Sequence, residues 1–197
     1  MNRRELLGAL CATIALPVFA GLPADGLWAT GRRVHARARG RGRAFQVLDP
    51  HQSETVATIA EMIIPATDTP GARAAEVHRF IDLLLAEWAA DDERAKFLQG
   101  LADIDARARG AFGTDFLTAT AAQRVTLLTQ LDGEAQKSDP TQPAAQPPFF
   151  QQLKWVAVFG YCTSEVGANA ELHYQTIPGS YDACTDLGSW RAAPGDY

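Results

Sequence analysis

The sequence is poor in cysteine and histidine and has none of the strong catalytic or metal-binding motifs. Its 197 residues include 3 Cys and 4 His, and no Cys-x-x-Cys, His-Glu-x-x-His or glycine-rich phosphate loop occurs. A metal site would have to be assembled from scattered positions. With 16 Gly and 11 Pro and no glycine period, collagen-like and wholly disordered chains are excluded. The length and composition fit one ordinary globular domain.

Basic residues are scarce outside the N-terminal region. Eight of the 18 Lys and Arg residues lie in positions 1–43, which leaves 10 basic and 21 acidic side chains in residues 44–197, a net charge of −11. A surface with that excess of carboxylates repels a phosphate backbone. We therefore expect no nucleic-acid binding by the folded part.

The start of the chain has the pattern of an export signal. Arg3 and Arg4 precede an apolar stretch over residues 6–20, which is about as long as a signal-peptide core and too short to span a bilayer comfortably. An arginine pair directly before such a core is typical of the twin-arginine signal, which exports folded proteins. A Sec signal that begins with two arginines is the alternative.

Two short sequences fit the pattern that signal peptidase cleaves. Val18-Phe19-Ala20 has small or permissive residues at the required positions, and Leu27-Trp28-Ala29 is the weaker candidate. We therefore assign residues 1–30 to the signal peptide, with cleavage between 20 and 30, and expect a periplasmic protein. An uncleaved signal that acts as a membrane anchor is the alternative.

Residues 31–47 are predicted to be an Arg- and Gly-rich linker. Positions 31–43 hold six Arg, three Gly and one apolar residue larger than alanine. A segment of this composition cannot bury a core and is expected to be a flexible connector. Contact of the basic run with acidic lipid headgroups or an acidic partner is the alternative.

Residues 48–197 are predicted to form an all-α domain, a compact bundle of about five helices with a long irregular C-terminal tail that wraps a partner. Apolar residues recur at spacings of three and four, between capping and turn residues. The last helix is apolar on most faces and is expected to be the central core helix. The predicted helices span about 50–64, 77–88, 121–132 and 149–163, with another that begins at Asp91 and is ended by Gly110 and Gly113.

The chain offers little for catalysis. Ser164 and Glu165 lie close in sequence to His173, and these residue types could supply a nucleophile and a base, although polar residues at a helix end more often serve structure. A stand-alone small periplasmic enzyme or ligand-binding domain that uses these three residues is kept as the alternative function.

Cys162 and Cys184 are the two thiols expected in the mature chain, and the periplasm is oxidising. If they pair with each other, they close a loop of about 23 residues and stabilise the fold by roughly 3 kcal/mol. They could instead pair with a partner subunit or stay free and buried. The Cα separation decides among these alternatives, so the sequence leaves them open.

Three features occur together in a specific order. They are the twin-arginine start, Ile63–Ala72 with the sequence IIPATDTPGA, and Phe159–Ala168 with the sequence FGYCTSEVGA, followed by Tyr174 and Pro178-Gly179. In this combination the chain, over about residues 48–187, resembles the small subunit, subunit 3, of the gluconate 2-dehydrogenase family. That family includes the small subunits of membrane-associated FAD-dependent glucose and sugar 3-dehydrogenases.

The resemblance implies a non-catalytic subunit with no cofactor of its own. In that family a large flavoprotein of the glucose-methanol-choline (GMC) type holds FAD and oxidises the sugar or aldonate, and a multihaem cytochrome c often passes the electrons to the membrane. The large subunit commonly lacks an export signal. We therefore expect this chain to escort the large subunit through the twin-arginine translocase, to stabilise it, and to lie at the inner membrane through the complex.

The expected contacts with the partner lie in the second half of the chain. Interface anchors are typically aromatic and fully desolvated, and the alternative for each is packing within its own domain. The predicted interface residues are Tyr161, Thr163, Ser164, Glu165, Tyr174, Pro178, Gly179, Tyr181 and Trp190.

Overall fold

The computed structural model describes residues 24–38, 44–136 and 147–172, and within these ranges the regular structure is helical, without strands. The all-α prediction is confirmed. No helix in these ranges is both long enough and apolar enough to cross a membrane. The helices are α2 (Ala24–Ala38), α3 (Pro50–Ile63), α4 (Val77–Glu87), α5 (Asp91–Phe112), α6 (Ala121–Gln136), α7 (Phe149–Cys162) and α8 (Glu165–Ala170).

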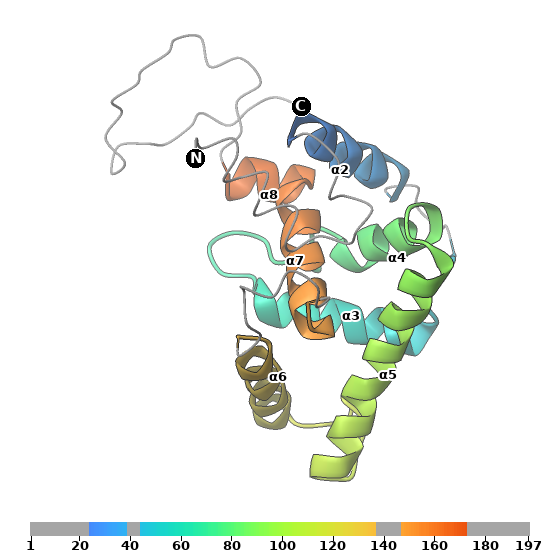
Figure 1. The fold of residues 1–197 in the computed structure, drawn as a ribbon. Coiled ribbons are helices and arrows are strands. Elements are labelled where there is room, and N and C mark those ends of the chain that lie inside the picture. Colours follow the sequence, from blue (N-terminus) through green and yellow to red (C-terminus); the bar gives the residue numbers. More distant parts are fainter. Residues whose placement is uncertain (1–23, 39–43, 137–146, 173–197) are drawn as a thin grey trace.

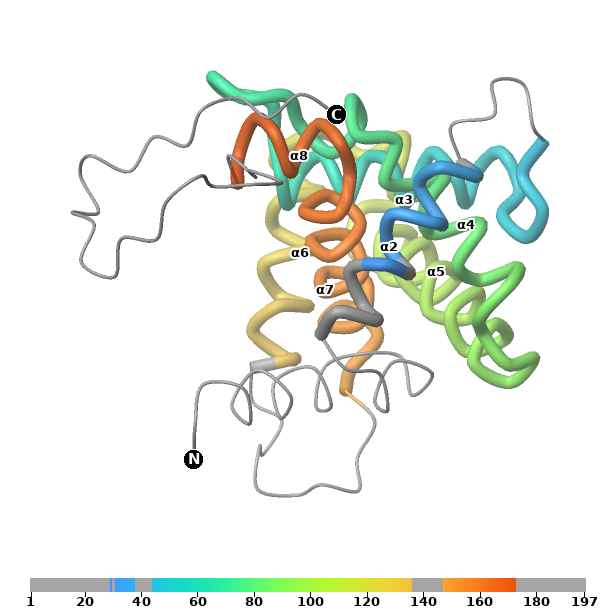
Figure 2. The backbone as a smooth tube through the Cα atoms, turned by 90° about the horizontal axis from the view of Figure 1, so that it is seen from above, coloured from blue at the N-terminus to red at the C-terminus, as the bar shows by residue number. Residues whose placement is uncertain are grey.

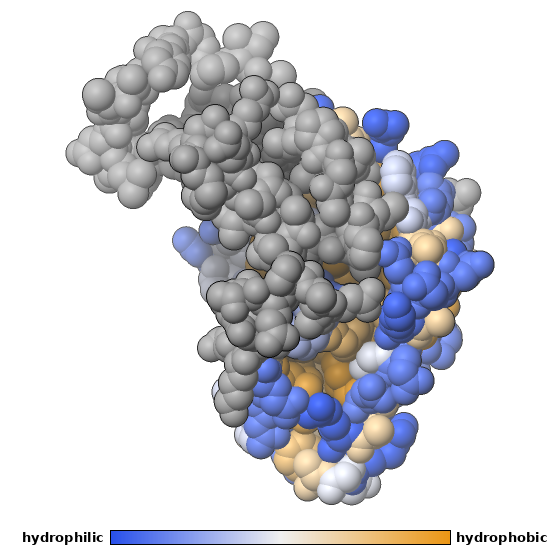
Figure 3. Space-filling view, viewed as in Figure 1, coloured by the Kyte–Doolittle hydropathy of each residue, from blue (hydrophilic) through white to orange (hydrophobic). Residues whose placement is uncertain are grey.

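Helix α7 lies at the centre of the arrangement and contacts α2, α3, α4, α5, α6 and α8 (Figure 1). Its buried side includes Phe150, Leu153 and Val156, which join the main hydrophobic core. The prediction of a central core helix is therefore confirmed. Figure 3 shows the molecule from the same side as Figure 1. Hydrophilic residues cover the part over α5, and hydrophobic residues are visible between α5 and α6.

Local sequence signals explain where α3 and α6 begin. Asp49 accepts the Gln52 amide N–H at 2.8 Å, and the Gln52 side chain accepts the Asp49 N–H at 3.0 Å, with Pro50 in the first helical position. Thr120 and Gln123 make the same reciprocal pair before α6, at 3.3 and 2.8 Å. These pairs satisfy amide groups that have no partner inside the helix.

One helix runs further than predicted. Helix α5 passes through Gly110 and ends at Gly113, the second of the two glycines predicted to end it, which caps it with a φ of 78°. Helix α6, in contrast, continues through Gly133 to Gln136. A glycine within a helix costs only about 1 kcal/mol relative to alanine, so an isolated glycine does not end a helix that packing supports. Helix α8 was not predicted, and it is only six residues long.

The prediction of a flexible linker is wrong for residues 31–38, which belong to α2. Val34 is 1% exposed and His35 is 5% exposed, and α2 packs against α4 and α7 (Figure 2). The average composition of this segment does not indicate a helix. The spacing does, because the small or apolar residues Leu27, Gly31 and Val34 recur at intervals of four and three among the arginines.

The stretch before α3 is also held in place. The carboxylate of Asp82, a residue that is 5% exposed, accepts the backbone N–H groups of Gln46, Val47 and Leu48, each at 2.9 Å. A buried carboxylate is stable when hydrogen bonds replace its water. Residues 46 and 47 are therefore anchored to α4, which again differs from a flexible linker, whereas residues 39–43 lie outside the described part of the chain.

Candidate functional site

The two sequence stretches that carry the family resemblance meet in the folded chain. The Tyr161 hydroxyl donates to the Pro70 carbonyl oxygen at 2.8 Å, and the Thr69 hydroxyl donates to the Glu171 carboxylate at 3.0 Å. We call residues 64–72 the 64–72 loop. Figure 1 shows it between α3 and α4, close to α7 and α8 and on the side away from α5.

Glu61 organises the 64–72 loop from its base. One carboxylate oxygen accepts the Ala66 N–H at 3.1 Å, and the other accepts the Arg73 N–H at 2.8 Å. A Cβ atom on Gly71 would lie 2.5 Å from the Glu61 carboxylate and 2.6 Å from the Ala66 nitrogen, so only glycine fits. The Ala72 N–H then donates to the Ile64 carbonyl at 3.0 Å and closes the loop.

The tip of the loop is exposed and acidic. Residues 65–68 are all exposed. The Thr67 N–H donates to the Thr69 carbonyl at 3.0 Å, and the Thr67 hydroxyl donates to the Asp68 carboxylate at 2.9 Å. This hydrogen bond from Thr67 lowers the pKa of Asp68 below its usual value. The tip therefore presents a negative charge on a locally hydrogen-bonded backbone.

Three predicted interface residues lie inside this chain instead of on its surface. Tyr161, Thr163 and Ser164 are 3%, 5% and 3% exposed. The Thr163 hydroxyl donates to the Phe159 carbonyl at 2.7 Å, and the Ser164 hydroxyl donates to the Tyr161 carbonyl at 2.6 Å. The Thr163 and Ser164 hydroxyls serve the turn from α7 to α8, and the Tyr161 hydroxyl serves the 64–72 loop. Since all three side chains are buried, they are not placed where a partner could reach them.

Ser164 is the N-cap of α8. Its hydroxyl oxygen accepts the Gly167 N–H at 2.9 Å while its proton is donated to the Tyr161 carbonyl. This is the standard role of serine at a helix start, so the structure does not favour the nucleophile that the alternative enzyme would need. His173, the base in that alternative, lies outside the described residues.

Glu165 is exposed in the first turn of α8, so it keeps the surface position that the interface prediction requires. The remaining predicted positions lie outside the described residues, and their interface roles stay predictions. They are Arg3 and Arg4 of the signal, and Tyr174, Pro178, Gly179, Tyr181 and Trp190 of the tail.

Cys162 lies half-buried on α7 and has no disulfide partner among the residues that the structure describes. Burial raises the pKa of this thiol, and the negative charge of Glu171 raises it further, so the protonated thiol is favoured at neutral pH. Cys184 lies outside the described residues, and the three alternatives for the pairing of these cysteines therefore stay open.

A groove of about 340 Å³ lies beside the base of the loop. Arg73 donates to both carboxylate oxygens of Glu54, at 2.6 and 3.2 Å, and to the Thr58 hydroxyl at 2.9 Å. This pairing lowers the pKa of Glu54 and raises that of Arg73. The residues that line the groove are Glu54, Thr58, Glu61, Met62, Arg73, Leu117 and Arg124.

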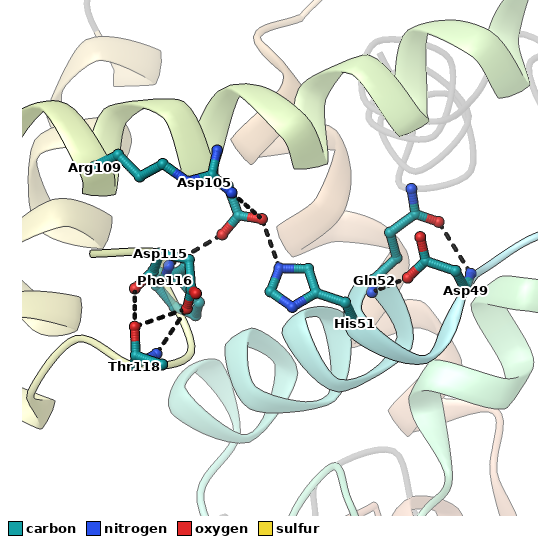
Figure 4. Close-up of polar contacts among 8 residues, drawn as sticks. All are labelled: Asp49, His51, Gln52, Asp105, Arg109, Asp115, Phe116 and Thr118. Atoms are coloured by element: carbon teal, nitrogen blue, oxygen red, sulfur yellow. Dashed lines mark hydrogen bonds and ion pairs between the residues drawn. The ribbon is translucent and has the colours of Figure 1, made fainter. Parts of the chain in front are cut away.

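A second polar cluster joins α3, α5 and the segment before α6 (Figure 4). His51 Nε2 lies 2.6 Å from the Asp105 carboxylate, whose other oxygen accepts the Phe116 N–H at 3.0 Å. These contacts tie three parts of the chain together, which is a structural role. In the described ranges, no group of three or more His, Cys, Asp or Glu side chains is placed to hold a metal ion.

His78, which follows the loop on α4, should make stability depend on pH. Its Nδ1 is buried and has no hydrogen-bond partner in the described part of the chain. Burial lowers the pKa of His78 below its usual value of 6.5, and the positive charges of Arg79 and Arg73 act in the same direction, against Glu76 and Glu54. The unfolded chain therefore binds this proton more readily than the folded chain does.

The free energy of unfolding should consequently be at its full value well above pH 6.5 and fall as the pH is lowered through 6.5 towards the lower pKa of the folded state. His78→Phe and His78→Gln, which do not titrate, should flatten this dependence. Urea unfolding of the wild type and both variants at several pH values tests it. An equally steep fall in both variants would show that His78 is not its source.

No sequence pattern pointed to Glu61 or Glu171 as part of the site, although Gly71 lies in the IIPATDTPGA stretch. A glycine two residues after Thr69 in a turn-rich segment was the one available signal that the backbone there approaches another group closely.

The sequence model of the family described as gluconate 2-dehydrogenase subunit 3 matches residues 50–179. This range includes the 64–72 loop, α7 and α8, which are the elements that form the site. No curated protein and no solved structure matches the chain. The chain therefore belongs to the gluconate 2-dehydrogenase subunit 3 family, whose name places it among the subunits of multi-subunit dehydrogenase complexes.

Proposed function

We propose that this chain is the non-catalytic small subunit of a periplasmic, FAD-dependent dehydrogenase complex of the GMC type that oxidises a sugar or an aldonate. Membership of the subunit 3 family supports its place in a dehydrogenase complex. FAD belongs to the large flavoprotein subunit, and haem c belongs to a cytochrome subunit where one is present. This chain holds neither cofactor and acts as export escort and stabilising partner.

The observation that carries this proposal is the shape of the 64–72 loop. Glu61 holds its base, Tyr161 holds Pro70, and Glu171 holds Thr69, while residues 65–68 stay exposed. A loop whose conformation is already restricted loses little conformational entropy when it binds. An exposed loop that lies in one family stretch and is braced in part by Tyr161 of the other is therefore suited to docking on the large subunit.

The escort role follows from the same association. A partner that binds only the folded large subunit stabilises it by mass action. The twin-arginine route accepts folded proteins, so a flavoprotein that already holds FAD could cross the membrane together with this chain. The N-terminal pair Arg3 and Arg4 would then supply the export signal for both subunits.

The loop tip gives a direct test of the docking surface. Asp68→Arg should reduce the affinity for the large subunit by about tenfold or more, because a reversed charge in an interface costs at least about 1.4 kcal/mol. Asp68 is exposed, so the variant should unfold at the same urea concentration as the wild type. Binding can be measured by pull-down of the large subunit over a range of protein concentrations.

Asp103→Arg is the matched control, since Asp103 is exposed on α5 and the variant has the same change in charge. It should bind the large subunit as the wild type does. If Asp68→Arg also retains full affinity, the loop tip is not part of the interface. If both variants lose affinity equally, the effect comes from net charge and not from the loop.

A further inference from the structure

Helix α2 is docked on the body of the protein through a close backbone contact. Val34 is 1% exposed, and Gly31 is buried. A Cβ atom on Gly31 would lie 2.7 Å from Thr163 Cβ, so the absence of a side chain allows α2 to approach the end of α7. This contact involves Thr163, which lies in the FGYCTSEVGA stretch of the family resemblance.

His35 adds a polar contact and an aromatic contact to this docking. Its Nε2 lies 2.6 Å from the Gly160 carbonyl oxygen, so this nitrogen must carry the proton, since a carbonyl only accepts. Its ring stacks on Phe80, with centroids 4.6 Å apart and an angle of 24° between the planes. Phe80 is 0% exposed, so α2 helps to cover the core.

The arginine-rich side of α2 faces outward. Arg32 and Arg33 are exposed, and Arg37 forms an ion pair with Glu87 at the end of α4. Helix α2 therefore has the character of an amphipathic helix that belongs to the folded domain. Figure 2 shows it lying between α7 and α4.

This placement bears on where the export signal ends. The weaker cleavage sequence, Leu27-Trp28-Ala29, lies inside α2, and a cut after Ala29 would remove the first six of its 15 residues. Helices shorter than about 12 residues are marginal without strong packing. A peptide bond inside a docked helix is reached by a protease only after local unfolding.

We propose that α2 stays with the exported protein and that signal peptidase cuts after Ala20, at Val18-Phe19-Ala20. The inference depends on the proposed export of the chain in its folded state. Only in a folded chain is α2 already docked on the domain when the peptidase meets it. The docking of α2 would thus select the processing site, and the mature protein would begin at Gly21.

The experiment uses the full chain, expressed with its large subunit in a host that has the twin-arginine translocase. The N-terminus of the periplasmic protein is read by mass spectrometry. The wild type should begin at Gly21. Gly31→Val, whose side chain would meet Thr163, should undock α2 and yield a second species that begins at Thr30.

Arg33→Val is the matched control, because it places the same residue in the same helix at an exposed position. It should begin only at Gly21. His35→Ala, which removes the contacts with Gly160 and Phe80, provides a second way to undock α2 if Gly31→Val does not accumulate. It should also yield the species that begins at Thr30.

The outcomes separate the inference from the proposed function. A wild-type protein that begins at Thr30, or that keeps its signal, overturns the inference and leaves the escort role standing. If Arg33→Val yields the Thr30 species as readily as Gly31→Val, docking does not select the site. If no chain reaches the periplasm, the proposed export is wrong and the inference falls with it.

Discussion

Gly167→Ala should destabilise the chain by about 3 kcal/mol, a large loss for the addition of one methyl group. A Cβ atom at this position would overlap the Tyr161 carbonyl oxygen and lie 2.8 Å from the carbonyl carbon. Backbone atoms cannot rotate away as a flexible side chain does. Helix α8 would have to shift, and the Ser164 cap and the Thr69 contact with Glu171 would be disturbed with it.

Urea unfolding followed by circular dichroism measures this effect, and Gly133→Ala is its control. Gly133 lies in α6 with no atom within 4 Å of a Cβ at that position. Alanine there should stabilise the chain by up to about 1 kcal/mol, since it favours the helix. If the two variants change stability alike, the close approach of α8 to Tyr161 is not present in solution.

Replacing Arg3 and Arg4 together with lysine should reduce the dehydrogenase activity of the periplasm to background. Lysine does not reproduce the planar guanidinium group, and the twin-arginine signal is defined by its arginine pair. If the large subunit has no signal of its own, it should stay in the cytoplasm with its FAD. Activity and flavin absorbance in the two cell fractions measure the distribution.

Replacing Arg32 and Arg33 with lysine provides the control, because this second arginine pair is exposed on α2. Export should be unchanged in that variant. A large subunit that reaches the periplasm in the Arg3 and Arg4 variant, in the amount seen with the wild type, would contradict the escort role.

The helices with clear local signals were the ones that the sequence predicted well. Asp49 with Pro50, and Thr120 with Gln123, mark the starts of α3 and α6, because capping depends on residues only three positions apart. Helix α2 was missed because an argument from average composition overlooked its helical spacing. Its burial depends on α4 and α7, which lie far away in the sequence.

The candidate site was only partly predictable for the same reason. The stretches IIPATDTPGA and FGYCTSEVGA were identified, but no sequence pattern shows that Tyr161 binds the Pro70 carbonyl 91 positions away. Tyr161 was predicted as a partner anchor because aromatic residues are common in interfaces. In the fold its ring is buried, and its hydroxyl braces the exposed loop instead.

The most direct test of the account is a pull-down of the tagged, natively exported chain, with mass spectrometry and a visible absorbance spectrum of the eluate. We predict a co-purifying polypeptide of the size of a flavoprotein large subunit, together with flavin absorbance. A colourless eluate that contains this chain alone would contradict the proposal that it is the escort subunit of a flavin-dependent dehydrogenase.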